Sequence, residues 1–266
     1  MRDTTHPVPP QRFPAITALV GACAVLFAVG GCSTTPSGPQ AAETQLTTPG
    51  SALSADPLDI HILGSAAQVT VLPLPAEEPA NTGDVEQDAD ARDGGASEEP
   101  VMIKVTSDND RAALPLVTQP SAQRYEVRSD LGDEAGSSHI TVLLHADATW
   151  NVSLDAPVDT FTADFATLNV DELHLSESVA TATVTTPHER DINIEQSGGA
   201  GQVTVIAPAG ATPNVIFNVG YGQADIDGTT FTSGEEISLP TSEADGSPQI
   251  TVSHTAGIGQ FTLQRR

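Results

Sequence analysis

Hydrophobic and polar residues alternate in short runs over most of this chain beyond residue 57, and turns rich in Gly, Asp and Pro separate the runs. Alternation with period two and frequent Val, Ile and Thr predicts β-strands, whereas no stretch shows a helical period. Apolar pairs also recur at a fixed interval of 21 residues. The pairs are Ile140/Val142, Phe161/Ala163, Ala182/Val184, Val203/Val205 and Ala224/Ile226, and a sixth pair, Phe261/Leu263, follows after 37 residues.

A second apolar row lies nine residues upstream of this one, and the same offset links Ile60/Ile62 to Val69/Val71. A fixed period in the range of about 20–50 residues is typical of repeat architectures. We therefore predict an all-β fold, a single-stranded parallel β-solenoid (β-helix-like) with coils of about 21 residues that stack in chain order at about 4.8 Å. A β-sandwich also suits short strands, but it gives no reason for the constant interval.

Glycines precede several of the aligned strands, as in "GGAGQVTV" (198–205). We expect them to form the corners of the coils, because glycine adopts positive φ and lets neighbouring backbones approach. The corner glycines are Gly199/Gly201, Gly220/Gly222 and Gly257/Gly259.

The N-terminal segment 1–31 is typical of an export signal, with basic residues before an uncharged apolar run that ends in "VGGC" (29–32). It resembles the signal peptides of bacterial lipoproteins, which implies that Cys32 carries a lipid such as palmitate. Two alternatives are lipidation of Cys23 and an uncleaved membrane anchor, since the run is close to the roughly 20 residues that span a bilayer. All three place the protein on the outer side of the cell membrane.

The sequence divides the rest of the chain into a tether and one domain. Residues 32–57 are rich in Thr, Ser, Pro and Gly, which predicts a flexible tether behind the lipid anchor. Residues 58–266 form the β-solenoid domain. We expect a disordered acidic insert at 73–100, which lacks the spacing of a calcium-binding loop, and a hairpin or loop at 227–249 that leaves the stack before its last coil.

The formal net charge of −25 excludes a nucleic-acid partner, because an acidic surface repels phosphates. The two cysteines both lie in or next to the signal segment, so the domain has no disulfide and no thiol nucleophile. No catalytic motif is present, and the histidines lack the spacing of metal ligands; His174 and His254 are expected at outward or edge positions. Asp225 and Asp227 share a strand face, but no basic residue recurs near them. We therefore predict no catalytic residue, no cofactor and no metal site.

Threonine occupies the position between the two apolar residues of nearly every repeat. In stacked strands these side chains would form one outward column, which either stabilises the strands or serves as a flat binding face. The candidate binding face consists of Thr141, Thr162, Thr183, Thr204 and Thr262, and Asp225 interrupts it.

The glycine corners, the run "ATWNVSLDAPVDTFTADFATLNVDELHLS" (148–176) and the lipoprotein signal together resemble bacterial envelope domains called putative adhesin or toast-rack-like domains. The resemblance covers residues 58–72 and 101–263. It implies a β-solenoid and an envelope location, and it implies no functional residue. Some such domains belong to membrane proteins of the cell-wall antibiotic response.

The sequence favours a non-catalytic, membrane-anchored lipoprotein that binds a wall glycan or an envelope protein. A regulatory domain that contacts a membrane sensor in the envelope stress response is the alternative, and a β-helix enzyme that processes glycans is the third hypothesis.

Overall fold

The computed structural model describes residues 42–47, 56–64, 66–75, 100–108, 115–129, 138–233, 237 and 246–266. Within these ranges every regular element is a β-strand, so the all-β prediction is confirmed. No helix of the described residues is long and apolar enough to cross a membrane. The predicted signal peptide, both cysteines and most of the predicted acidic insert lie outside the described residues.

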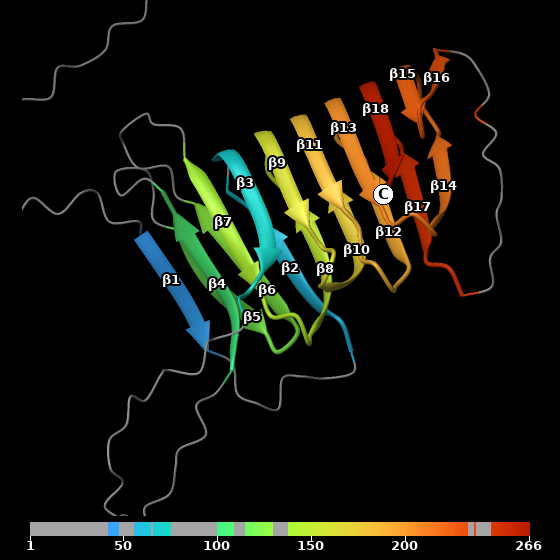
Figure 1. Cartoon of the computed structure of the whole chain (residues 1–266). Coiled ribbons are helices and arrows are strands. Elements are labelled where there is room, and N and C mark those ends of the chain that lie inside the picture. The colour runs from blue at the N-terminus through green and yellow to red at the C-terminus, as the bar shows by residue number, and fades with distance from the viewer. Residues whose placement is uncertain are drawn as a thin grey trace, which may run out of the picture. The chain divides into compact units, whose positions relative to one another are not determined.

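The strands form two mixed sheets that are mostly parallel and lie face to face (Figure 1). Sheet A runs in the order β1 (Ala42–Thr47), β4 (Val101–Ser107), β7 (His139–Leu144), β3 (Ala66–Pro73), β9 (Val158–Asp164), β11 (Val179–Thr185), β13 (Ala200–Ala207), β18 (Ile258–Arg265), β15 (Tyr221–Ile226) and β16 (Thr229–Thr232). Sheet B runs in the order β14 (Thr212–Phe217), β17 (Gln249–His254), β12 (Ile192–Gln196), β10 (Asn169–Leu175), β8 (Thr149–Leu154), β2 (Leu58–Ile62), β6 (Arg124–Ser129) and β5 (Pro115–Ser121).

The hydrophobic core lies between the sheets, because every second residue of a strand points inward. In β8, for example, Trp150, Val152 and Leu154 are buried and the residues between them are half-exposed. Fully burying a large apolar side chain stabilises a fold by roughly 1.5–3 kcal/mol. The core therefore carries the stability of a domain that has no disulfide among its described residues.

The register expected from the sequence is found in the middle of sheet A. Phe161 of β9 pairs with Ala182 of β11, which pairs with Val203 of β13, all in parallel. The upstream row pairs in the same way in sheet B, where Val152 lies beside Leu173. Residues one repeat apart are thus direct neighbours here.

The order of the strands differs from the expected order at both ends of the stack. Strands β2 and β3 lie between β6–β7 and β8–β9, so Val69 separates Ile140 from Phe161. Strands β17 and β18 lie between β12–β13 and β14–β15, so Phe261 separates Val203 from Ala224. The prediction that the coils stack in chain order was wrong, because similar apolar pairs fit beside one another in any order and long connections precede β4 and β17.

One further segment differs from its predicted role, and the predicted excursion begins as a hairpin that stays in sheet A. Residues 42–47, inside the predicted tether, form β1 and pair antiparallel with β4. The expected excursion begins with a hairpin, since β15 and β16 pair antiparallel around Asp227 and Gly228. Both turn residues have positive φ, 50° and 81°, as a two-residue hairpin turn requires. This hairpin, rather than the C-terminal coil, ends sheet A.

The corner glycines are explained by close approach and not by positive φ. Among the described glycines only Gly228 and Gly246 have positive φ. A Cβ on Gly222 would lie 2.4 Å from the carbonyl oxygen of Gly259, whereas a Cβ on Gly220 or Gly257 would meet nothing within 4 Å. In the pairs Gly220/Gly222 and Gly257/Gly259, the second glycine is therefore required because the neighbouring backbone lies too close for a side chain, and the first glycine is not.

Candidate functional site

The outer face of sheet A brings all five predicted threonines into one column, together with two threonines that the sequence analysis missed. Each lies beside the next on a paired strand, in the order Thr106, Thr141, Thr70, Thr162, Thr183, Thr204 and Thr262. The sequence did contain a signal for Thr70, because it lies between the apolar residues Val69 and Val71 just as the other threonines lie between their apolar pairs.

Asp225 does not interrupt this threonine column. Because β18 lies between β13 and β15, Thr262 follows Thr204 directly and Asp225 stands after the last threonine. Its carboxylate accepts hydrogen bonds from the backbone N–H of Gly228 at 3.1 Å and from Thr230 Oγ1 at 3.1 Å. Asp225 thus stabilises the β15–β16 hairpin.

A second outward column runs two residues upstream of the threonines. Its members are His139, Gln68, Thr160, Thr181, Gln202, Gln260 and Gln223. Neither this column nor the seven threonines contains a carboxylate, lysine or arginine, although the chain carries a net charge of −25. We call the two columns the neutral lattice; its side chains lie about 4.8 Å apart across strands and roughly 6.8 Å apart along them.

The outer face of sheet B differs in charge and shape. It carries a shallow hollow of about 280 Å³ over β2, β8, β10 and β12, which we call the sheet-B hollow. Outward side chains form two rows across these strands. One row is Asp59, Asn151, Glu172 and Asn193, and the other is His61, Ser153, His174 and Glu195.

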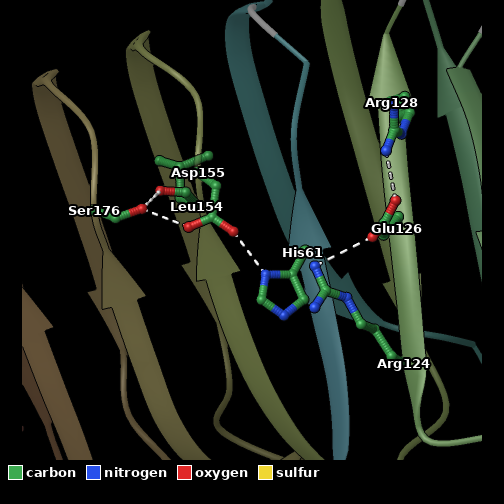
Figure 2. A network of polar contacts seen from close by, with 7 residues as sticks. All are labelled: His61, Arg124, Glu126, Arg128, Leu154, Asp155 and Ser176. Carbon is green, nitrogen blue, oxygen red and sulfur yellow. Dashed lines mark hydrogen bonds and ion pairs between the residues drawn. The ribbon is translucent and has the colours of Figure 1, made fainter. Parts of the chain in front are cut away.

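A network of polar contacts flanks the sheet-B hollow (Figure 2). Asp155 Oδ2 lies 2.6 Å from His61 Nδ1, and Asp155 Oδ1 accepts a hydrogen bond of 2.5 Å from Ser176 Oγ. Burial opposes ionisation of Asp155, but the hydrogen bonds from Ser176 and His61 and the nearby His174 outweigh it and lower its pKa. His61 and Ser176 both contact the carboxylate and not each other, so this is not the relay of a nucleophilic triad.

The acids near this network differ in their partners. Glu126, beside His61 in the sheet, forms ion pairs with Arg128 at 2.8 Å and Arg124 at 3.1 Å, and the hydrogen bond from Arg128 lowers its pKa most. Glu172 and Glu195 have no hydrogen-bond or ion-pair partner among the described residues.

The acids considered for catalysis have structural partners. Asp227 Oδ2 accepts a hydrogen bond of 2.7 Å from Arg265 Nε, and the Asp225 carboxylate binds the hairpin turn. Within the described part of the chain, no three His, Cys, Asp or Glu residues are grouped so as to hold a metal ion.

His254 is placed differently from its predicted outward or edge position. Its side chain is fully buried between the sheets, where it stacks on Phe217 at 4.9 Å and meets Phe261 edge-on at 5.0 Å. Burial lowers its pKa to about 4, so the ring is neutral at pH 7. His254 Nδ1 lies 2.8 Å from Gln196 Oε1, while Nε2 has no partner among the described residues. His174 does point outward, as predicted.

Comparisons with known proteins relate this chain to others through its fold. No model of a known protein family matches the sequence, and no curated protein matches it. The structure is similar to that of a putative cell adhesion protein from Clostridium sporogenes, with 15% identity and a TM-score of 0.57 over 85% of this chain and 100% of that one. A putative adhesin from Parabacteroides merdae aligns over 85% of this chain and 97% of that one, at 9% identity and a TM-score of 0.19. At 15% identity, the first similarity shows a shared all-β fold.

Proposed function

We propose that this chain is a non-catalytic, adhesin-like binding module whose contact surface is the neutral lattice of sheet A. In this proposal the paired sheets are a β-solenoid with coils of about 21 residues, held at the outer side of the cell membrane by a lipid on Cys32. The single observation that carries the proposal is the unbroken column of seven threonines beside a column of glutamine, threonine and histidine.

The chemistry of the lattice favours a neutral, hydroxyl-rich polymer, such as a wall glycan, as the ligand. Hydroxyl and amide groups both donate and accept hydrogen bonds, as sugar hydroxyls do. The two columns carry no carboxylate, although Asp164 and Lys104 lie beside them on the same face, so covering the columns themselves avoids the cost of desolvating carboxylates. The name of the Clostridium sporogenes protein, a putative cell adhesion protein, supports an adhesive role.

Retention on insoluble neutral glycan tests the proposal. The variant Thr183→Lys with Thr204→Lys places two charged, bulky side chains in the centre of the lattice, and we expect it to lose most of the retention, about tenfold or more. Thr251→Lys with Asn214→Lys adds the same charge to the outer face of sheet B and serves as the control. Equal retention of wild type and both variants, all folded by circular dichroism, would exclude the lattice as the contact.

Photocrosslinking in intact cells identifies the partner. A photoreactive residue at Thr183 reports on sheet A, and one at Glu195 reports on sheet B. We expect glycan adducts from Thr183. A discrete adduct with a membrane sensor protein would instead favour the regulatory alternative.

A further inference from the structure

We propose that one end of the stack binds a second copy of this chain. At this end sheet A finishes in β16 and sheet B finishes in β14, and we call it the stepped end. In the proposed dimer, β16 of each copy lies beside β14 of the other, so that the two cores join. The interface is separate from the neutral lattice and does not depend on the function proposed for that lattice.

Sheet A extends one strand further than sheet B at the stepped end. Strands β14 and β15 follow each other in one coil and lie opposite each other, since the rings of Phe217 in β14 and Tyr221 in β15 are 4.6 Å apart. Strand β16 continues sheet A beyond β15, whereas sheet B ends at β14 within the described residues. No described strand therefore lies beside β14 and opposite β16.

Apolar side chains are incompletely covered at the stepped end. Val215 and Phe217 of β14 and Phe231 of β16 pack against the core but are only half-buried. Three large apolar side chains are exposed among the described residues, and two of them, Ile216 and Val219, lie here with 41% and 47% of their surface exposed. A further strand beside β14 would remove part of this apolar surface from water, which is favourable.

The backbone of β14 is also ready to pair with another strand. The N–H of Asn218 donates to the carbonyl oxygen of His254 in β17. Because the backbone groups of alternate residues in a strand point to opposite sides, the N–H groups of Val215 and Phe217 point away from β17. An edge strand of this kind is a template for pairing with another chain.

The distribution of charge favours a second copy as the occupant. Two copies that each carry a net charge of −25 repel each other wherever their acidic surfaces meet. Residues 196–224 and the strand Thr229–Thr232 contain no Asp, Glu, Lys or Arg, so a second copy can approach at the stepped end. The chain's own segment 234–245, which follows β16, contains four acidic residues. Pairing of β14 with β16 of a second copy therefore brings less charge to this apolar edge than pairing with that segment.

The extra strand of sheet A determines how two copies fit together. If β14 paired with β14 of the other copy in one continuous sheet, the two β16 strands would compete for the same space in sheet A. A two-fold axis parallel to the strands avoids this, because it brings sheet A of one copy into line with sheet B of the other. Strands β14 and β16 run in the same direction (Figure 1), so each β16 then pairs in parallel with β14 of the other copy. The contact is closed and self-complementary, as in most symmetric dimers.

Photocrosslinking of the full chain in intact cells tests the proposal. A photoreactive residue replaces Ile216, and the crosslinked dimer is separated from the monomer by mass before its peptides are mapped. We expect a homodimer in which this residue is joined to residues 229–232 of the other copy. The control places the photoreactive residue at Leu116, which is 52% exposed on β5 at the other end of sheet B, and should give no homodimer.

Sedimentation of the full chain in mild detergent measures the strength of the association. We expect Ile216→Glu to weaken dimer formation about tenfold or more, because it places like charges at the interface of both copies. Leu116→Glu adds the same charge at the other end of the sheet and should leave dimer formation within about twofold of the wild type.

Four results would overturn the proposal. A crosslink from Ile216 to residues 234–245 of the same chain would mean that the chain covers its own edge; Ile237 of that segment packs against the core. A crosslink to a different protein would assign the edge to another partner. Equal weakening by the two glutamate variants would place the contact elsewhere, and a wild-type chain that stays monomeric up to about 100 µM would exclude the dimer.

Discussion

Gly259 of β18 lies so close to Gly201 of β13 that a Cβ on Gly259 would be 2.6 Å from the carbonyl oxygen of Gly201. Gly222 of β15 stands in the same relation to Gly259, at 2.4 Å. Because the obstructing atoms belong to backbone, they cannot rotate away as a flexible side chain would. These glycines let three strands pack in register at one end of sheet A.

We expect Gly259→Ala to lower the free energy of unfolding by about 1–3 kcal/mol, because the methyl group must push two strands apart. Gly257→Ala is the matched control, since a Cβ there meets nothing within 4 Å. It should leave stability unchanged or raise it by up to about 1 kcal/mol through the unfolded state. Urea unfolding of the two variants measures the difference, and equal midpoints would contradict the close approach.

Disulfide formation tests the interleaved order of the strands. Thr70 of β3 and Thr162 of β9 are direct neighbours. Thr141 of β7 lies on the other side of Thr70, so it is two strands away from Thr162. With Cys23 and Cys32 replaced, we expect Thr70→Cys with Thr162→Cys to form a disulfide under mild oxidation. The Cα atoms of residues on neighbouring strands are about 4.8 Å apart, which a disulfide can bridge. Residues two strands apart are separated by about twice that distance, beyond the limit of about 7 Å between the Cα atoms of a disulfide.

The control for this experiment is Thr141→Cys with Thr162→Cys, the pair that would be adjacent if the coils stacked in chain order. It should stay reduced. Peptide mapping after proteolysis distinguishes the two cases. A disulfide in the control pair and none in the test pair would restore the sequential stack.

The sequence predicted the strands of the 21-residue repeats, their register in the middle of sheet A and five of the seven threonines of the column, because period-two alternation and a constant interval follow directly from backbone geometry. It did not predict which coils are neighbours. The inward-facing pairs Val69/Val71 and Phe261/Leu263 resemble the apolar pairs on the strands beside them. The local sequence therefore does not specify where β3 and β18 stand in the order of sheet A. For the same reason the unbroken column and the sheet-B hollow, which both combine strands distant in sequence, appear only in three dimensions.

The buried imidazole of His254 makes stability depend on pH. Its pKa of about 4 in the fold lies below the value of 6.5 for an exposed histidine. The folded state therefore takes up this proton less readily than the unfolded state. Stability from this group is complete above pH 6.5, falls as the pH drops towards 4, and changes no further below that value.

We expect this drop to amount to about 3 kcal/mol, and His254→Leu should remove most of it. His188→Leu is the control, since it replaces an exposed histidine by the same residue and removes no buried imidazole. Denaturant unfolding between pH 7 and pH 4 measures both slopes. Asp155, whose pKa is lowered from 3.8, loses its contribution only below this range and does not mask the effect. Parallel slopes for wild type and His254→Leu would contradict a buried neutral imidazole.

The proposed attachment to the membrane through Cys32 can be tested with Cys23 of the same segment as the matched control. We expect Cys32→Ala to abolish the incorporation of labelled palmitate, because the substitution removes the thiol sulfur to which the lipid would be attached. We also expect the variant protein to leave the membrane fraction. Cys23→Ala should behave as the wild type. Loss of label in Cys23→Ala alone would move the modification to that residue. If the Cys32→Ala protein stays in the membrane without label, the result would instead favour an uncleaved anchor. The apolar N-terminal segment is close to the roughly 20 residues that span a bilayer, so it could hold the protein in the membrane by itself.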